Sequence, residues 1–201
     1  MIDQETAWDQ QLQIHTTGRD DTRSDTYRYP YEPTPYSVLN RLTESGWFSA
    51  HNTVLDYGCG KGRVDFFLAH ETEAKAIGIE YDARILEGAI QNKKTAAGHP
   101  AAEFVLAKAE EYAVPAEVDR CYFFNPFSVE ILRKAMARIL ASYYDAPREI
   151  LLFFYYPSDE YVAYLMTVDE LDFYDEIDCA DLFAGNDKRE RILIFSLPYY
   201  A

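Results

Sequence analysis

The chain contains the stretch Val54-Leu55-Asp56-Tyr57-Gly58-Cys59-Gly60-Lys61-Gly62-Arg63. It joins a short apolar run to three glycines at alternate positions, and a helical pattern follows with Val64, Phe67 and Leu68 on one face. Glycine adopts positive φ and has no Cβ to obstruct a ligand that approaches the backbone. The helix behind the turn presents free N–H groups and the positive end of its dipole. These residues predict a strand, a turn and a helix that suit a ligand carrying a carboxylate or a phosphate.

The glycine spacing differs from that of a dinucleotide site, whose fingerprint is G-x-G-x-x-G. The third glycine, Gly62, comes one residue early, and Arg63 occupies the place of the last glycine. This spacing disfavours a pyrophosphate ligand and an NAD-dependent oxidoreductase, for which 201 residues also leave little room. A glycine turn without any ligand is the structural alternative.

A second apolar run, residues 76–82, ends in the acidic residues Glu80 and Asp82. Glu80 lies 22 residues after Gly58, close to the spacing of about 20 expected of a carboxylate that hydrogen-bonds a ribose diol. With these residues the sequence resembles the class I S-adenosylmethionine (SAM) dependent methyltransferases. Their first motif is a strand ending in Asp followed by G-x-G-x-G, and an acidic residue ends their second strand. The resemblance covers about residues 53–158 in recognisable order.

The resemblance implies a SAM site, with S-adenosylhomocysteine as the product. It places Asp56 at the end of the first-motif strand and Glu80 on the ribose, and it puts around the methionine part of SAM the residues Gly58, Gly60 and Gly62.

The adenine contacts that the resemblance implies depart from the family pattern. The family places an acidic and a small residue near Ala109, but Lys108 occupies the usual acidic position, so Glu110 is the candidate for its hydrogen bond. A solvated charge cluster at Glu110 and Glu111 is the alternative.

Apolar runs and helical patterns alternate along the rest of the chain. Further strands are expected at residues 103–106, 121–124, 150–156, 171–174 and 192–196, and helices at residues 82–98 and 128–140. This alternation predicts a doubly wound, mostly parallel sheet with helices on both faces. The family resemblance implies a seven-stranded sheet of the Rossmann-like kind, with an antiparallel strand near the C-terminus.

The first 50 residues precede this alternation, and we interpret residues 1–50 as an N-terminal cap of helix and loop. Residues 51–201 then form the SAM-binding core, in one domain overall. A short helix is expected around Trp8 and Leu12. Thr34 is expected to cap a second helix with Pro35 at its first position, and Gly46 to end it.

Ligands of such sheets bind at the carboxyl ends of the strands, and Asn125-Pro126-Phe127 follows the fourth strand. It resembles the Asn-Pro-Pro-aromatic motif of methyltransferases that modify amino or amide nitrogens, with one proline missing. In that motif the Asn oxygen and a backbone carbonyl accept hydrogen bonds from the attacking N–H groups, which positions the nitrogen. The alternative is a turn before a helix that Ser128 caps. Asp159 and Glu110 are candidate proton acceptors.

Aromatic faces attract substituted ammonium groups, and the chain has 17 tyrosines. Most, Tyr155 and Tyr156 among them, are expected in the core or the sheet. The candidates for a substrate site lie ahead of the first strand, at Tyr27, Tyr29, Tyr31 and Tyr36.

The net charge of -15 lacks the basic footprint of nucleic-acid binding. Acidity favours cationic partners, or simply solubility. The basic side chains near the glycine stretch are expected on a solvated surface; they are Arg19, Arg23, Arg28, Lys61 and Arg63.

Three cysteines and four histidines show no metal-ligand spacing, so no metal site is predicted. Reduced thiols fit a cytoplasmic protein. Neither a signal peptide nor an apolar run long enough to span a membrane is evident.

The sequence therefore predicts a SAM-dependent methyltransferase that acts on a nucleophile, with a nitrogen of a protein side chain or a small amine favoured over nucleic acid. A SAM-binding module without transfer activity and an NAD-dependent oxidoreductase are the alternatives. The acceptor molecule, the atom methylated and the oligomeric state are left open.

Overall fold

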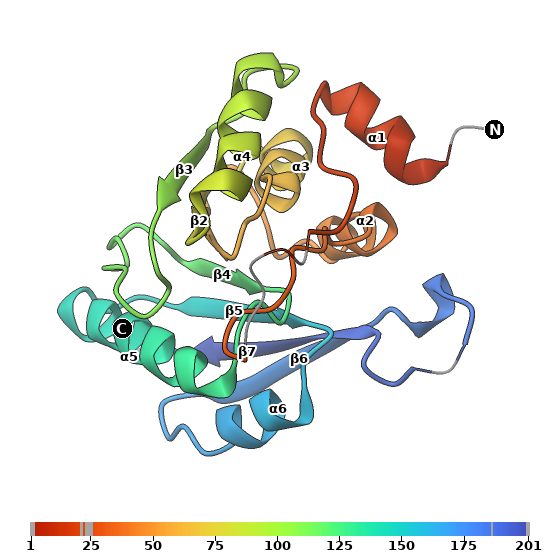
Figure 1. Ribbon diagram of the computed structural model, residues 1–201. Helices are drawn as coiled ribbons and strands as arrows, with labels where there is room; N and C mark the ends of the chain where they lie inside the picture. The colour runs from red at the N-terminus through yellow and green to blue at the C-terminus, as the bar shows by residue number, and fades with distance from the viewer. Residues whose placement is uncertain (1–2, 21, 23–25, 186, 200–201) are drawn as a thin grey trace.

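A seven-stranded sheet forms the middle layer of the protein (Figure 1). The computed structural model describes residues 3–20, 22, 26–185 and 187–199. The strand order is β3-β2-β1-β4-β5-β7-β6. The strands are β1 (Thr53–Tyr57), β2 (Lys75–Glu80), β3 (Ala102–Leu106), β4 (Arg120–Phe123), β5 (Ile150–Tyr155), β6 (Asp172–Asp178) and β7 (Arg191–Leu197).

The first five strands are parallel, and β7 pairs antiparallel with both β5 and β6. The chain reverses its direction of winding between β1 and β4, so the topological switch point lies at their carboxyl ends. This topology confirms the doubly wound, mostly parallel sheet and the antiparallel strand near the C-terminus that the sequence predicts.

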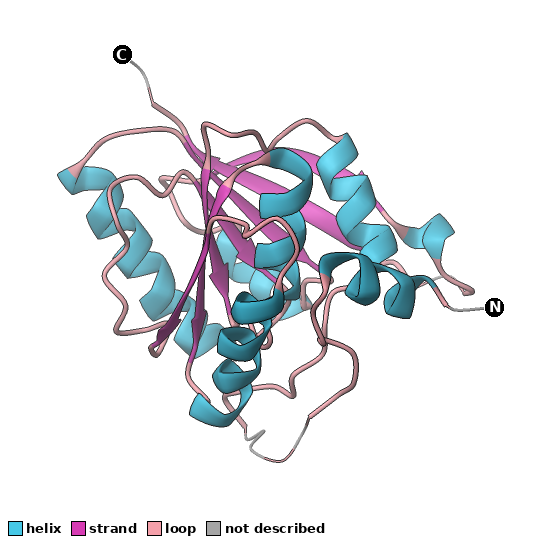
Figure 2. Ribbon diagram, turned by 90° about the horizontal axis from the view of Figure 1, so that it is seen from above, coloured by secondary structure: helices cyan, strands magenta, loops and turns pink. Residues whose placement is uncertain are grey.

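Helices cover both faces of the sheet (Figure 2). Two large apolar clusters, one on each side, hold these helices to the strands. α1 (Gln4–Leu12), α2 (Tyr36–Glu44) and α3 (Arg63–Thr72) contribute to one cluster, and α5 (Val129–Asp145) and α6 (Asp159–Leu165) to the other. α4 (Ala83–Thr95) packs on β2 and β3, and a short 3-10 helix spans Ala180–Leu182. In the part of the chain that the structure describes, no helix is long and apolar enough to cross a bilayer.

Several expected element ends differ from the structure. Thr34 does not cap α2: its hydroxyl lies 3.0 Å from the Tyr122 hydroxyl, Pro35 holds the N-cap position, and the helix begins at Tyr36. The buried Tyr122 hydroxyl requires a hydrogen-bond partner. The Thr34 hydroxyl is that partner, so it does not cap the N-terminus of α2. α4 ends at Thr95, before the expected Gly98. Strand β6 extends to residue 178, because pairing with β7 includes acidic residues that sequence patterns exclude from strands.

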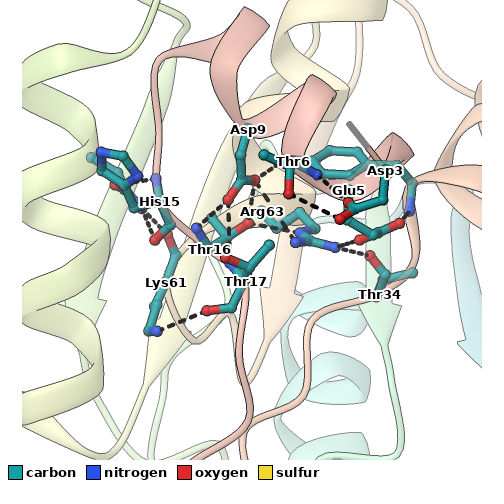
Figure 3. Close-up of polar contacts among 12 residues, drawn as sticks. Asp3, Glu5, Thr6, Asp9, His15, Thr16, Thr17, Thr34, Lys61 and Arg63 are labelled. Atoms are coloured by element: carbon teal, nitrogen blue, oxygen red, sulfur yellow. Dashed lines mark hydrogen bonds and ion pairs between the residues drawn. The ribbon is translucent and has the colours of Figure 1, made fainter. Parts of the chain in front are cut away.

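The segment before α2 is tied to the core by Arg63, the first residue of α3 (Figure 3). The Arg63 side chain is 2% exposed, so the expectation of a solvated surface is wrong for it. Its Nε donates to Thr16 Oγ1 at 2.7 Å, its Nη1 donates to the Thr34 carbonyl at 3.2 Å, and it pairs with Glu5. The Arg63 guanidinium also lies 4.2 Å from the centroid of the Tyr36 ring.

Asp9 of α1 is the second buried charge of this cluster, at 5% exposure. Its carboxylate lies 3.8 Å from Arg63 Nη2 and accepts hydrogen bonds from the Thr16 N–H and hydroxyl and from the Tyr36 hydroxyl. Buried charges persist only where partners replace water, so α1, the following loop and α3 are held as one unit. The division between cap and core at residue 50 stays a prediction.

Replacing Arg63 by Leu is expected to lower the free energy of unfolding by about 3–5 kcal/mol, because it leaves the Asp9 carboxylate buried without its cation. Urea unfolding followed by circular dichroism measures the loss. The matched control is Arg41→Leu, which breaks the more exposed ion pair with Asp181 and should cost much less. Equal losses in the two variants would contradict the role given to Arg63.

Candidate active site

The loop between β1 and α3 has a backbone that only glycine adopts without strain. Gly58, Gly60 and Gly62 have φ angles of +78°, +58° and +85°. A Cβ on Gly60 would lie 2.1 Å from a ring carbon of Tyr31, and one on Gly58 would lie 2.8 Å from Pro126 Cβ. The N-terminal segment and the turn after β4 therefore lie directly against the glycine loop.

Glu80, at the end of β2 and 6% exposed, supports this loop. Its carboxylate accepts hydrogen bonds from the N–H groups of Gly60 at 3.2 Å, Tyr81 at 2.9 Å and Asp82 at 2.9 Å. Burial raises the pKa of Glu80, and these backbone hydrogen bonds oppose the rise. A carboxylate has about four acceptor positions, so a position remains for a hydroxyl of a bound ribose.

Asp56, in β1, faces a second buried carboxyl, that of Asp65 in α3. Asp56 is 3% exposed and Asp65 is fully buried, and the two side chains interact by a hydrogen bond. Burial, with the charge of Glu80 adding to it, raises the pKa of Asp56 to about 7. Burial and the neighbouring Asp56 raise the pKa of Asp65 well above its usual range. Two such carboxyls favour sharing a proton at neutral pH.

These residues border one cleft, the glycine-loop cleft, at the carboxyl ends of the strands. The cleft opens to solvent, and together with its solvent-open part it spans about 930 Å³. One wall is the strap, which we define as residues 26–35. Among the lining residues are Gly58, Glu80, Ala109 and Glu110 from the core and Tyr29 and Tyr31 from the strap.

The strap is fixed across the cleft by Arg28. Arg28 Nη2 lies 2.7 Å from Glu110 Oε1, and the two side chains are 19% and 17% exposed. The Arg28 guanidinium also lies 4.8 Å from the centroid of the Tyr81 ring. The solvated surface expected for Arg28 and the solvated cluster considered for Glu110 are therefore both wrong. Lys108 and Glu111 do form an exposed pair, at 2.9 Å.

Glu110 and Ala109 both lie on the cleft lining, after β3, the region in which the sequence predicts the adenine contacts. In this structure Glu110 already pairs with Arg28, so an adenine hydrogen bond from Glu110 would share this carboxylate. The adenine role of both residues stays a prediction.

The Asn125-Pro126-Phe127 turn follows β4 and pairs with the strap through the Tyr29 N–H, which donates to the Pro126 carbonyl at 3.2 Å. Asn125 has a φ of +41°, a left-handed conformation that Asn tolerates better than most residues. Its Oδ1 is buried and has no hydrogen-bond partner among the described residues. Phe127 packs edge-on against Tyr57 at 6.5 Å between ring centroids, in the core behind the turn.

The four tyrosines predicted for the substrate site lie in different environments in the structure. Tyr36 is fully buried and its hydroxyl donates to Asp9, so it lies in the core and is no substrate residue. Tyr31 covers Gly60, and Tyr29 is 38% exposed and lines the glycine-loop cleft. Tyr27 is 52% exposed and is not among the lining residues of that cleft. The structure therefore brings Tyr29 and Tyr31 to the cleft, and their substrate role stays a prediction.

Sequence reasoning missed Arg28 as a residue of the site and Tyr155 and Tyr156 as lining residues of a second groove beside it. The signal available for both tyrosines was their place at the carboxyl end of a strand, where ligands of this fold bind. The remaining basic candidate, Arg23, lies outside the described residues, and Arg19 is exposed as expected. Among the described residues, no group of three or more His, Cys, Asp or Glu side chains could hold a metal ion.

A family model described as a methyltransferase domain matches residues 54–147. A protein-lysine N-methyltransferase from Saccharolobus islandicus (strain REY15A) is 36% identical over 64 residues, which are 31% of this chain and 40% of that protein. The match thus spans less than half of the length of this curated relative.

Solved structures share the fold at low sequence identity. An RNA methyltransferase from Salinibacter ruber, in complex with S-adenosyl-L-homocysteine, matches with a TM-score of 0.60 at 18% identity, over 85% of this chain and 96% of that one. A TehB-like SAM-dependent methyltransferase from Corynebacterium glutamicum matches with a TM-score of 0.55 at 15% identity, over 83% and 89% of the two chains. The methyltransferase-domain match over residues 54–147 and the fold shared with these solved structures agree with the class I SAM-dependent methyltransferase, with SAM as the cofactor, that the sequence predicts.

The Asp56–Asp65 pair should make stability depend on pH. Because the pKa values of both carboxyls are raised on folding, the folded protein holds a proton that the unfolded chain has lost between about pH 4 and pH 7. The free energy of unfolding should therefore fall as pH rises through this range, by up to about 1.4 kcal/mol per pH unit for one proton. Asp65→Asn should flatten this fall.

The measurement is urea unfolding at a series of pH values from 4 to 8. Asp145→Asn, which neutralises an exposed acid at the end of α5, is the control and should keep the wild-type slope. A slope that Asp65→Asn leaves unchanged would show that the pair does not hold the proton.

Glu80→Gln is expected to weaken the binding of S-adenosylhomocysteine at least about tenfold, because a charged acceptor for the ribose is lost. The substitution also sets an amide N–H2 against backbone donors of the loop. Titration calorimetry measures the affinity, with exposed Glu87→Gln on α4 as the control. Unchanged affinity in folded Glu80→Gln, or binding of NAD in place of S-adenosylhomocysteine, would overturn this assignment.

Proposed function

We propose that this protein transfers the methyl group of SAM to a nitrogen nucleophile on a protein side chain or a small amine. The buried, unpartnered Oδ1 of Asn125 is the observation that carries the proposal. An acceptor oxygen without a partner, away from water, costs about 1–3 kcal/mol. An N–H group of a bound amine would remove that cost, and the same hydrogen bond would orient the nitrogen for attack.

The position of the Asn125 turn suits transfer from a donor on the glycine loop. Pro126 lies so close to Gly58 that a single added Cβ would collide with it. The backbone carbonyl of Pro126 accepts one hydrogen bond, from Tyr29, and has a second lone pair. A nitrogen held between this carbonyl and Asn125 Oδ1 would therefore lie next to the glycine loop, which is the proximity that in-line transfer requires.

The residues of the glycine-loop cleft fit the donor. The absence of a Cβ at Gly60 and Gly58 lets Tyr31 of the strap and Pro126 pack directly against the loop, and these two residues also line the cleft in which the donor would bind. Glu80 retains an acceptor position that would take a ribose hydroxyl, and Ala109 and Glu110 on the cleft lining would contact the base. When bound, SAM supplies the activated methyl group and the leaving group. This chain would bind and orient both reactants and exclude water from them.

Two comparisons bear on the acceptor. The curated relative from Saccharolobus islandicus is named a protein-lysine N-methyltransferase, which supports an amine acceptor. The neighbour from Salinibacter ruber is an RNA methyltransferase, but an identity of 18% carries the fold alone. The net charge of -15 opposes phosphate backbones, whose neutralisation supplies most non-specific nucleic-acid affinity. The proton acceptor stays open between Glu110, which pairs with Arg28, and Asp159, the exposed first residue of α6.

Removal of the Asn125 oxygen should reduce methyl transfer at least about tenfold, the equivalent of one hydrogen bond to the reacting group. Asn125→Gly removes the oxygen and tolerates the φ of +41°. Asn125→Asp keeps an oxygen in the same conformation and should retain more activity. The assay supplies SAM with a labelled methyl group to cell extract and separates protein, RNA and small-molecule fractions.

Both variants should bind S-adenosylhomocysteine as the wild type does, which calorimetry checks. Label found mainly in RNA, or transfer equal in the wild type and Asn125→Gly, would reject the nitrogen acceptor. Binding of the cofactor without any transfer by the wild type would identify a binding module instead.

A further inference from the structure

A second groove adjoins the glycine-loop cleft on the other side of the strap. The two share the lining residues Tyr29, Pro30, Glu32 and Phe124, and the second groove, with its solvent-open part, spans about 1040 Å³. We name it the aromatic groove. Its lining includes Tyr29, Phe124, Asn125, Tyr155, Tyr156 and Glu190.

Three rings of this groove form one wall. Phe124 lies with its ring centroid 4.7 Å from that of Tyr155 and 6.5 Å from that of Tyr156, and the two tyrosines are 6.1 Å apart. Phe123 of β4 pairs with Phe154 of β5, so the parallel register places Phe124 beside Tyr155 at the carboxyl ends. Sheet pairing therefore fixes this wall at the carboxyl ends of the strands, where ligands of such sheets bind.

Glu190 adds a negative charge to this wall. It precedes β7, is half-buried, and accepts a hydrogen bond from the Tyr155 hydroxyl at 2.7 Å. It forms no ion pair with any residue that the structure describes. Arg19 and Glu32 also line the groove, but both are exposed and they pair with each other at 3.2 Å. The charge that lacks a counter-ion is thus the one against the aromatic rings.

A cation already packs on one ring of the wall. The Arg189 guanidinium lies 4.4 Å from the centroid of the Tyr156 ring, and its Nη2 donates to the Tyr156 hydroxyl at 2.6 Å. Asp187 balances this arginine, with an oxygen 3.1 Å from the same Nη2. The pairing of Arg189 with Asp187 leaves Glu190 as the carboxylate open to a further cation.

We propose that the aromatic groove binds the alkylammonium group of the methyl acceptor, with Glu190 as its counter-ion and Phe124, Tyr155 and Tyr29 as its aromatic walls. This inference rests on the proposed methyl transfer and names its substrate class. Aromatic faces and a half-buried carboxylate both stabilise a cation. Asn125 lines the same groove, so an ammonium held there lies beside the residue that we propose orients the attacking nitrogen.

The test measures binding of two matched probes, in the presence of saturating S-adenosylhomocysteine, by titration calorimetry or NMR. The probes are Nα-acetyl-lysine methylamide and its uncharged counterpart, Nα-acetyl-norleucine methylamide. The wild type should bind the lysine probe at least about tenfold more tightly. n-Butylamine, a third probe, separates a small amine from a protein side chain: tighter binding of the lysine probe indicates a peptide acceptor, and equal binding a small amine.

Glu190→Gln keeps an acceptor for the Tyr155 hydroxyl and removes the charge, so it should abolish the preference for the lysine probe. Tyr29→Leu, on the exposed strap, should weaken the lysine probe alone, because it keeps apolar volume and loses the aromatic face. The control is Glu176→Gln on β6, whose carboxylate pairs with Arg191 at 3.4 Å, and it should change neither probe.

Two outcomes would overturn the inference: equal affinity of the wild type for the charged and uncharged probes, or a lysine preference that Glu190→Gln leaves intact. The labelled-methyl assay on the same proteins keeps this failure apart from failure of the proposed function. Transfer to an amine that Glu190→Gln does not affect rejects the groove alone. Transfer to RNA rejects the function, whatever the probes show.

Discussion

Arg63 places a guanidinium in the interior directly behind the glycine loop, where solvent reaches 2% of its side chain. A charge at such a site requires partners that replace water, and the chain supplies them from α1, from Thr16 and from the carbonyl of Thr34. All of these partners precede the first strand. The condition that stabilises the cation therefore also fixes the N-terminal segment against α3, as Figure 3 shows.

The strap takes its position from these anchors. Thr34 at one end is held by Arg63, and the Tyr31 hydroxyl donates to the Thr16 carbonyl at 2.5 Å. Between them, Tyr31 covers Gly60, while Arg28 reaches across to Glu110. The strap is thus a wall of both the glycine-loop cleft and the aromatic groove, and the two reactants would meet at its inner side. In Figure 1 this segment runs between α1 and α2 and passes the ends of the central strands.

The parts of this arrangement that could be predicted from the sequence are those encoded locally. The glycines need positive φ and the strand ends need buried apolar runs, so the loop, the sheet and the position of Glu80 all follow from residue spacing. Asn125 could be singled out for the same reason, because it directly follows a strand. The burial of Tyr36 could not be predicted in this way, because it depends on Asp9 and Arg63, which lie 27 residues before and after it in the sequence. Local sequence patterns also predict that Arg63 is exposed, because its partners Glu5 and Thr16 are distant in the sequence.

The aromatic groove could not be predicted from the sequence either, because it depends on how the strands pair. Tyr155 was expected in the sheet, and it is there, 2% exposed and in register with Ile192 of β7. Being a sheet residue and lining a groove are compatible at the last position of a strand, and only the register of β4 with β5 brings Phe124 beside it. Glu190 joins them because β7 runs antiparallel and so starts where β5 ends.

The positions of the acidic side chains suggest a specific role for the net negative charge of the chain. The donor that we propose carries a positive sulfonium, and the acceptor binds as a positive ammonium that loses a proton before its nitrogen attacks. The carboxyls near the two cations belong to different clusters. Asp56, Asp65 and Glu80 lie behind the glycine loop, with pKa values raised by burial. Asp56 and Glu80 line the cleft, so a bound sulfonium would favour their ionised forms, and these two groups would hold SAM more tightly than S-adenosylhomocysteine, which lacks the sulfonium charge. Glu190 lies on the far side of the strap and would act on the ammonium alone. Because different carboxyls bind the two cations, S-adenosylhomocysteine could dissociate without weakening the binding of the acceptor.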